Sequence, residues 1–122
     1  MKIYESGEMY LESILVLRGR LGRVRSIDIV NYSGYSKPSI SRAVKLLHNE
    51  GCIDIDPDGF ITLTESGEEI AQKILARHET LSDFLVYIGV DKETASEDAC
   101  RMEHVISDTT YEKIKSFCDL KK

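Results

Sequence analysis

The sequence lacks the features that mark exported, membrane-spanning or cysteine-stapled proteins. Its three cysteines, Cys52, Cys100 and Cys118, are widely spaced and form no Cys-x-x-Cys motif, which excludes a zinc ribbon and a thioredoxin-like redox site. Apolar runs such as Ile14–Leu17 are only a few residues long, too short to cross a bilayer. The start of the chain, Met1–Glu5, has no basic stretch followed by an apolar core, so no signal peptide is predicted. We therefore expect a cytoplasmic protein with free thiols and no membrane partner.

The charge of the chain is unevenly distributed. Its net charge is -5, yet residues 18–48 contain seven lysines and arginines and a single acid, Asp28. A basic block inside an acidic chain is typical of a surface that binds a polyanion such as DNA. The alternative is a solvated charged face that has no ligand.

Hydrophobic periodicity predicts a mainly α-helical fold with one small β-hairpin. Helices are expected over residues 5–20, 26–32, 37–50, about 65–88, about 92–106, and from 107 or 108 onward. Side chains suited to helix N-caps begin most of them: Ser26, Ser36, Thr64, Asp91, and Ser107 or Asp108. Glycines are expected to end the first helix, at Gly19 and Gly22.

The hairpin completes a recognisable unit. Residues 52–55 and 60–63 are β-prone, and the turn between them reads Asp-Pro-Asp-Gly. Two short helices joined by a tight turn and followed directly by a hairpin form a winged helix-turn-helix. We expect this DNA-binding domain over residues 1–66 and a helical dimerisation domain over residues 67–122, because the later helices carry more apolar surface than so small a domain can bury alone.

The helix expected at residues 37–50 has the character of a DNA recognition helix. Short polar side chains at its start fit a major groove. The residues expected to face the groove are Ser36, Lys37, Pro38, Ser39 and Arg42, while Ser41 and Lys45 are expected to meet phosphates. A winged helix that binds only protein is the alternative. Ser33 stands where such motifs usually have Leu, so Tyr32 or Tyr35 is expected to fill the gap.

A second group of residues has the spacing of metal ligands. Cys100, Glu103 and His104 lie at i, i+3 and i+4, which places them on one face of the predicted helix. Thiolate, carboxylate and imidazole are the common ligands of divalent transition metals. The alternative is that these three side chains bind no metal and lie partly in the core and partly on a solvated face of the helix. A nucleophile–base pair of Cys100 and His104 has no third orienting group, so we expect no enzyme.

The stretch Glu97–Asp108 resembles the signature of the iron- and manganese-dependent repressors, the diphtheria-toxin-repressor family. Four further segments are similar to that family in order and spacing: Glu8–Glu12, Pro38–Ser41, Leu63–Gly67 and Arg77-His78. The resemblance covers nearly the whole chain. It implies a metal-activated repressor in a compact two-domain form, without the SH3-like third domain of many iron-type members.

The resemblance also implies ligands. Met9, Cys100, Glu103 and His104 match the positions of the primary-site ligands in the iron-type members. His78 matches a histidine of their ancillary site. The other ancillary helix ligands fall here at two serines, Ser82 and Ser96. Manganese-type members have acids at the positions of Met9 and Cys100. They also have a glutamate and a histidine, matched here by Glu12 and His78, that serve a second ion. The chain is thus a hybrid of the two types.

The function implied is repression of metal-homeostasis genes by a homodimer on a double-stranded DNA operator. The soft donors Met9 and Cys100 make Fe(II) the expected ion and Mn(II) the alternative, with Co(II), Ni(II) or Zn(II) as substitutes in vitro. A winged-helix regulator that ignores metals is the competing hypothesis. The operator, the regulated genes and the roles of Cys52 and Cys118 do not follow from the sequence.

Overall fold

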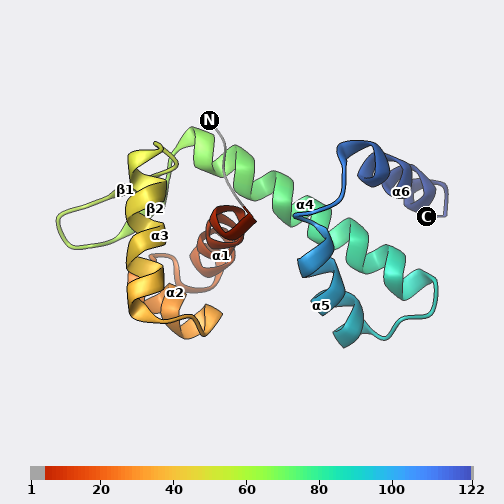
Figure 1. Ribbon diagram of the computed structural model, residues 1–122, viewed down its shortest axis with the longest axis horizontal. Helices are drawn as coiled ribbons and strands as arrows, with labels where there is room; N and C mark the ends of the chain where they lie inside the picture. The colour runs from red at the N-terminus through yellow and green to blue at the C-terminus, as the bar shows by residue number, and fades with distance from the viewer. Residues whose placement is uncertain (1–4, 122) are drawn as a thin grey trace. The chain divides into compact units, whose positions relative to one another are not determined.

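The computed structural model describes residues 5–121, which divide into two compact units, Met1–Gln72 and Lys73–Lys122 (Figure 1). Residues 1–4, which the signal-peptide prediction used, lie outside the described residues. One helix, α4, runs through the boundary between the units. The functional division expected between residues 66 and 67 therefore stays a prediction.

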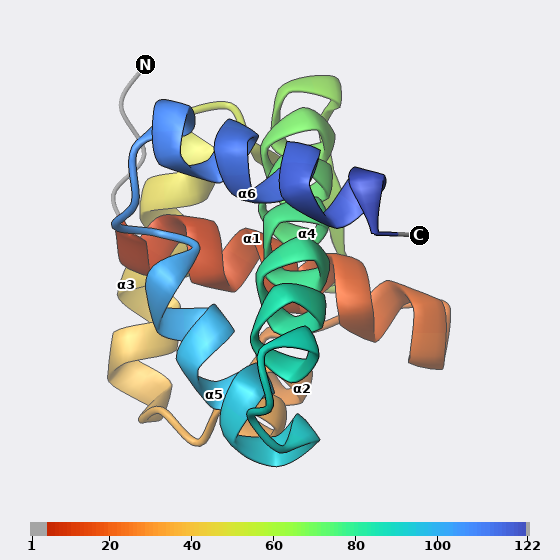
Figure 2. The same cartoon turned by 90° about the vertical axis from the view of Figure 1, so that its right-hand side faces the viewer.

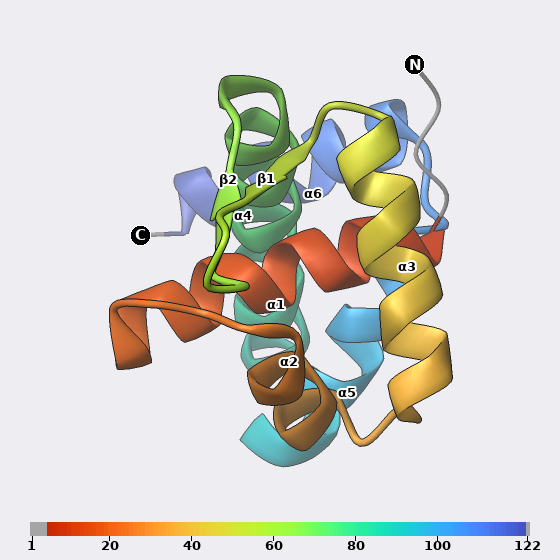
Figure 3. The ribbon, with the colours of Figure 1, turned by 90° about the vertical axis from the view of Figure 1, so that its left-hand side faces the viewer.

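The first unit is a winged helix-turn-helix. Its three helices are α1 (Glu5–Leu21), α2 (Ser26–Ser33) and α3 (Lys37–Asn49). Its two strands are β1 (Ile53–Ile55) and β2 (Ile61–Leu63). Figure 3 shows α3 with the hairpin beside it. Apolar side chains from all three helices and from β1 are almost fully buried and form the core: Leu11, Ile14, Ile29, Ile40, Leu47 and Ile53.

The wing is an antiparallel hairpin in which Ile55 pairs with Ile61 and Ile53 with Leu63. The carboxylate of Asp56 closes its turn by accepting the backbone N–H groups of Asp58 and Phe60, each at 2.9 Å. Val24, two residues before α2, adds an isolated bridge, since the N–H of Ile61 donates to its carbonyl at 2.7 Å. The wing is therefore tied to the helical core along β2.

The start of α4 (Glu65–Tyr87) is fixed by two small residues. The Thr64 hydroxyl donates to the Gly51 carbonyl at 2.6 Å and accepts the N–H of Gly67 at 3.2 Å, which confirms Thr64 as the helix cap. A Cβ on Gly67 would lie 1.9 Å from the carbonyl oxygen of Cys52. Only glycine therefore lets α4 approach the chain this closely.

The second unit contains the rest of α4 with α5 (Lys92–Met102) and α6 (Asp108–Leu120), which Figure 2 shows face on. The ring of Phe117 lies edge-on to Phe84 at 5.8 Å and to Tyr87 at 5.6 Å, so α6 packs on the end of α4. Asp91 caps α5 and Ser107 caps α6, each by accepting the N–H three residues further on. Both predicted caps are confirmed.

Three local predictions were wrong. Helix α5 ends at Met102 rather than at residue 106, because the carbonyl groups that follow turn toward a side chain of α4 instead of continuing the helix. The N-cap of α2 is Arg25 rather than Ser26, and the Asp28 carboxylate accepts the Arg25 N–H at 2.9 Å. Helix α1 passes through Gly19 and ends at Leu21, so the predicted stop at Gly19 is wrong and the one at Gly22 is confirmed. Among the described residues, no helix is long and apolar enough to cross a membrane.

Candidate metal centre and recognition helix

The start of α3 is organised by serine hydroxyls. Ser36 is its N-cap and accepts the N–H of Ser39 at 3.3 Å, while the two hydroxyls lie 2.9 Å apart. Pro38 is in the first turn, where its missing N–H has no cost. Six of the seven side chains predicted to meet DNA are exposed, and the seventh, Ser39, is half-buried.

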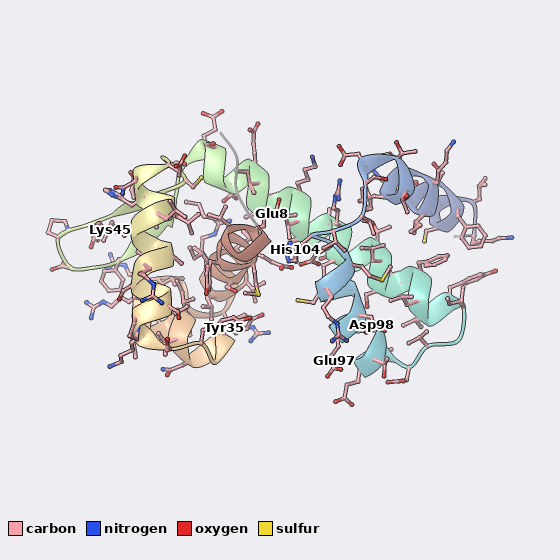
Figure 4. All side chains as sticks on the ribbon, viewed as in Figure 1. Glu8, Tyr35, Lys45, Glu97, Asp98 and His104 are labelled. Carbon is pink, nitrogen blue, oxygen red and sulfur yellow. The ribbon has the colours of Figure 1, made fainter. Side chains whose placement is uncertain are left out.

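The cationic side chains of α3 extend along its outer surface. Arg42 is exposed, and one of its terminal nitrogens lies 3.4 Å from the Ser39 hydroxyl. Lys45 is exposed one turn further on and projects away from α1 (Figure 4). The opposite side of α3 buries Ile40 and Val44. The amphipathic helix therefore presents short polar groups at its start and positive charge behind them.

The other basic side chains of residues 18–48 have partners within the first unit. Arg18 donates through both terminal nitrogens to the Glu68 carboxylate at 2.8 Å. These hydrogen bonds raise the pKa of Arg18 and lower the pKa of Glu68. The guanidinium of Arg20 lies 5.5 Å from the Tyr32 ring. The basic block is therefore only partly a feature of the recognition helix.

Tyr35, in the turn before α3, packs against α1. Its ring lies edge-on to Tyr10 at 6.0 Å, and its hydroxyl donates to the sulfur of Met9 at 3.8 Å. Both tyrosines expected to fill the position of the usual leucine contact side chains of α1: Tyr35 contacts Tyr10 and Met9, and Tyr32 contacts Arg20. Burial and the neighbouring Tyr35 raise the pKa of Tyr10, while Arg42 lowers it.

In the second unit, the Glu103 carboxylate lies between two imidazoles. Its Oε2 is 3.0 Å from Nδ1 of His78 on α4, and its Oε1 is 3.2 Å from Nε2 of His104. The Glu103 side chain is 0% exposed and that of His104 is 3% exposed. Burial of a carboxylate is costly unless positive charge or donors surround it. Carboxylate and imidazole donors at this spacing fit a divalent transition-metal ion.

Cys100, Glu103 and His104 were predicted to lie on one helix, but only Cys100 lies within α5. Cys100 is half-buried in the last turn of α5, Glu103 is the C-cap, and His104 lies in the following turn. The Glu103 backbone still has helical angles, and its N–H donates to Ala99. Glu103 therefore keeps a helical position beyond the last residue of α5.

His78 has a second polar neighbour in Ser96. The Ser96 hydroxyl lies 3.5 Å from Nε2 of His78, on the side of the ring opposite Glu103. The resemblance to the iron-type repressors implies an ancillary metal ligand at this position. Here it holds a hydroxyl that contacts the histidine. The two remaining predicted ligands, Met9 and Glu12, lie on α1 in the first unit and are half-buried.

Arg77 on α4 is a buried residue whose role the sequence pattern did not predict. Its side chain, 8% exposed, forms an ion pair with Asp108 at the start of α6. It also donates to the carbonyl oxygens of Glu103, at 3.5 Å, and Ile106, at 3.4 Å. Its guanidinium lies 4.8 Å from the ring centre of Tyr111. Arg77 thus holds the whole turn that carries Glu103 and His104.

A signal for this role was present in the sequence. Arg77 falls between Ile74 and Leu81 at helical spacing, so a charged side chain interrupts the apolar stripe of α4. Such a charge is buried only with partners.

The Cys52 thiol is not a candidate metal ligand. Its burial and the nearby Glu50 raise its pKa. A protonated buried thiol is a poor metal ligand.

Known proteins resemble this chain over most of its length. The family model of the iron dependent repressor, metal binding and dimerisation domain, matches residues 64–120. An uncharacterised helix-turn-helix transcriptional regulator of Methanocaldococcus jannaschii is 37% identical over 117 residues, 94% of each chain. The transcriptional regulator MntR of Escherichia coli O157:H7 is 34% identical over 88% of this chain and 70% of its own.

A solved structure agrees with these relatives. The manganese regulator SloR superimposes with a TM-score of 0.83 and 26% identity, covering 98% of this chain. The match covers 55% of the SloR chain, so the present chain spans about half the length of that protein. The winged helix and the helices after it therefore occur together in a regulator of the same fold.

Proposed function

Because the chain belongs to the family of iron- and manganese-dependent transcriptional repressors, we propose that a divalent transition-metal ion activates it to bind the operators of metal-homeostasis genes. The observation that carries this proposal is the buried Glu103 carboxylate between His78 and His104, in a chain that also presents an exposed recognition helix. A metal-independent regulator has no need of a buried carboxylate between two imidazoles.

The proposed primary ligands are Met9, Cys100, Glu103 and His104, with Glu12 and His78 available to a second ion. When bound, the ion supplies a fixed link between side chains that are far apart in the sequence. Glu103 and His78 hold each other in position beforehand, since their atoms are 3.0 Å apart. Thioether and thiolate donors favour Fe(II) over Mn(II), and Co(II), Ni(II) and Zn(II) serve as substitutes in vitro.

On the DNA side, the proposed contacts are those predicted from the sequence: Ser36, Lys37, Pro38, Ser39, Ser41, Arg42 and Lys45. Their exposure on α3 supports this assignment, with Ser39 half-buried. Ser39 also serves the helix itself, because it contacts both the N-cap and Arg42. We assign base reading to Arg42, whose guanidinium can form two hydrogen bonds with guanine, and phosphate contact to Ser41 and Lys45.

Dimerisation is the third part of the proposal. The C-terminal end of α4 and the end of α6 expose large apolar side chains, among them Tyr87 at 58%, Ile88 at 57% and Leu120 at 83%. Contiguous exposed apolar surface is typical of an interface. A two-fold dimer would present two recognition helices to half-sites one or more helical turns apart.

A titration of DNA binding tests the proposed function. The full chain is equilibrated with duplexes from upstream of metal-transport genes, with Fe(II), Mn(II) or chelator present. Affinity is expected to be at least about tenfold weaker in chelator, a difference of about 1.4 kcal/mol. Equal affinity with and without metal would favour the metal-independent regulator.

A further inference from the structure

We propose that Tyr35 is a positioning residue that couples the thioether of Met9 to the start of the recognition helix. Its hydroxyl holds the sulfur of Met9 in place for a metal ion, and its backbone leads directly into the N-cap of α3. This inference rests on the proposed function, since it concerns the regulation of the same metal-dependent binding.

The contact is specific to one of two similar tyrosines. Tyr35 and Tyr32 are three residues apart and almost equally exposed, at 46% and 44%. The hydroxyl of Tyr35 donates to the Met9 sulfur at 3.8 Å, whereas the ring of Tyr32 lies beneath the guanidinium of Arg20. The edge-on contact with Tyr10 fixes the ring of Tyr35 against α1. The contact of its ring with Tyr10 thus directs the hydroxyl to the sulfur.

The chemistry of a thioether gives this hydrogen bond a consequence. Methionine has three rotatable side-chain bonds, so an unrestrained Met9 loses considerable rotamer freedom when its sulfur is fixed. Its sulfur has two lone pairs and is a weak acceptor. The Tyr35 hydroxyl occupies one lone pair and restricts the rotation of the side chain. The other lone pair then remains to be donated to a metal ion at a reduced entropic cost.

The same residue reaches the DNA-reading surface through the backbone. Ser36, directly after Tyr35, is the N-cap of α3 and contacts Ser39. Ser39 in turn lies 3.4 Å from Arg42, the proposed base reader. The N–H of Tyr35 donates to the Ser33 hydroxyl at 3.2 Å, which closes the turn. A restraint on the Tyr35 side chain is therefore a restraint on the first turn of α3.

Linkage makes this coupling measurable from both ends. If Tyr35 joins the two sites, loss of its hydroxyl reduces the effect of metal on DNA affinity and the effect of DNA on metal affinity by the same factor. The expected factor is about three- to tenfold, the range produced by loss of one side-chain hydrogen bond. A residue that only stabilised the fold would leave this factor unchanged.

The experiment compares Tyr35→Phe with the matched control Tyr32→Phe. Co(II) affinity is measured without DNA, from the absorption of the bound ion. Binding to a labelled duplex, selected in vitro on the Co(II)-loaded wild type, is measured with Co(II) and with chelator. We expect Tyr35→Phe to bind Co(II) more weakly than the wild type does, and the gain in duplex affinity caused by Co(II) to be about three- to tenfold smaller. Tyr32→Phe should behave like the wild type.

A double-mutant cycle with Met9→Leu separates action through the sulfur from any other role. Leucine keeps the volume of the side chain but has no lone pair. The effect of Tyr35→Phe should therefore vanish in the Met9→Leu background. Equal behaviour of Tyr35→Phe and Tyr32→Phe would overturn the inference, and so would an equal loss of DNA affinity with and without Co(II). Failure of the wild type to respond to any metal would instead overturn the proposed function.

Discussion

His78 and Glu103 are twenty-five residues apart in the sequence, yet Nδ1 of the imidazole and Oε2 of the carboxylate lie 3.0 Å apart. The Glu103 side chain is fully buried and that of His78 is 24% exposed. A carboxylate and an imidazole are therefore already aligned within the second unit. Alignment before binding reduces the ordering cost of capturing an ion.

Cys100→Ala should remove the response of DNA binding to both Fe(II) and Mn(II). The thiolate is one of four proposed primary donors, and its loss leaves three. The matched control is Cys118→Ala, because Cys118 is also half-buried and lies outside the proposed site. DNA-binding titrations must be anaerobic, since Fe(II) and thiols both oxidise in air. A full Fe(II) response in Cys100→Ala would make Cys100 a core residue and the proposed primary site wrong.

The double change Met9→Asp with Cys100→Glu should shift activation from Fe(II) toward Mn(II). It replaces two soft donors with carboxylates, which suit Mn(II), and leaves Glu103 and His104 in place. The measurement is the ratio of DNA affinities with the two ions, compared with the same ratio for the wild type. An unchanged ratio would mean that donor softness at these two positions does not set the preference.

Arg42→Ala and Lys45→Ala should weaken DNA binding in different ways. Arg42→Ala should cost about 1–3 kcal/mol and relax the preference at one base position, as expected for a base contact. Lys45→Ala should weaken all sequences alike and reduce the salt dependence by about one phosphate contact. Affinities for a set of single-base variants of the duplex, measured at several salt concentrations, distinguish the two. A uniform loss with Arg42→Ala would reduce it to a phosphate contact.

Gly67→Ala should destabilise the first unit, while Gly19→Ala should stabilise it. The new Cβ at position 67 would lie 1.9 Å from the Cys52 carbonyl oxygen, so the backbone must shift. We expect a cost of about 1–3 kcal/mol, typical of overpacking. Gly19 is in a helix with nothing within 4 Å, and alanine there should gain about 0.5–1 kcal/mol. Urea unfolding measures both, and equal stability of the two variants would contradict the close approach.

The pairing of Arg18 with Glu68 should make stability depend on pH. The pKa of Glu68 is lower in the folded chain, so its contribution is present above its unfolded pKa and is lost as pH falls through the folded pKa. Both side chains are partly exposed, which limits the contribution to below about 1 kcal/mol. Glu68→Gln should lose stability at pH 7 but match the wild type in acid. A difference independent of pH would point to packing instead.

Much of the fold follows from local chemistry. The caps at Ser36, Thr64, Asp91 and Ser107 lie where the sequence predicts them, because a helix N-terminus is satisfied by neighbouring residues. The end of α5 does not follow, because Arg77 on another helix donates hydrogen bonds to the carbonyl oxygens of the next turn. Tertiary contacts of this kind leave no periodic pattern.

The sequence likewise predicts some features of the candidate site and not others. The spacing of Cys100, Glu103 and His104 indicates donors on one side of a helix, and the burial of Glu103 is consistent with that interpretation. The partners of Arg18 and Arg20 could not be predicted, since Glu68 and Tyr32 meet them only in the folded unit. A count of basic residues therefore overstated the charge available to DNA.

Arg77 holds the turn after α5 mainly through backbone carbonyl oxygens, those of Glu103 and Ile106, and through the Asp108 carboxylate. None of these contacts involves a side chain that is proposed to bind the metal ion. The backbone conformation of this turn therefore does not depend on which side chains stand at positions 103 and 104. If residues 103 and 104 are the metal ligands proposed above, a substitution that changes their donor atoms should change the metal preference while the Arg77 contacts keep the turn in place.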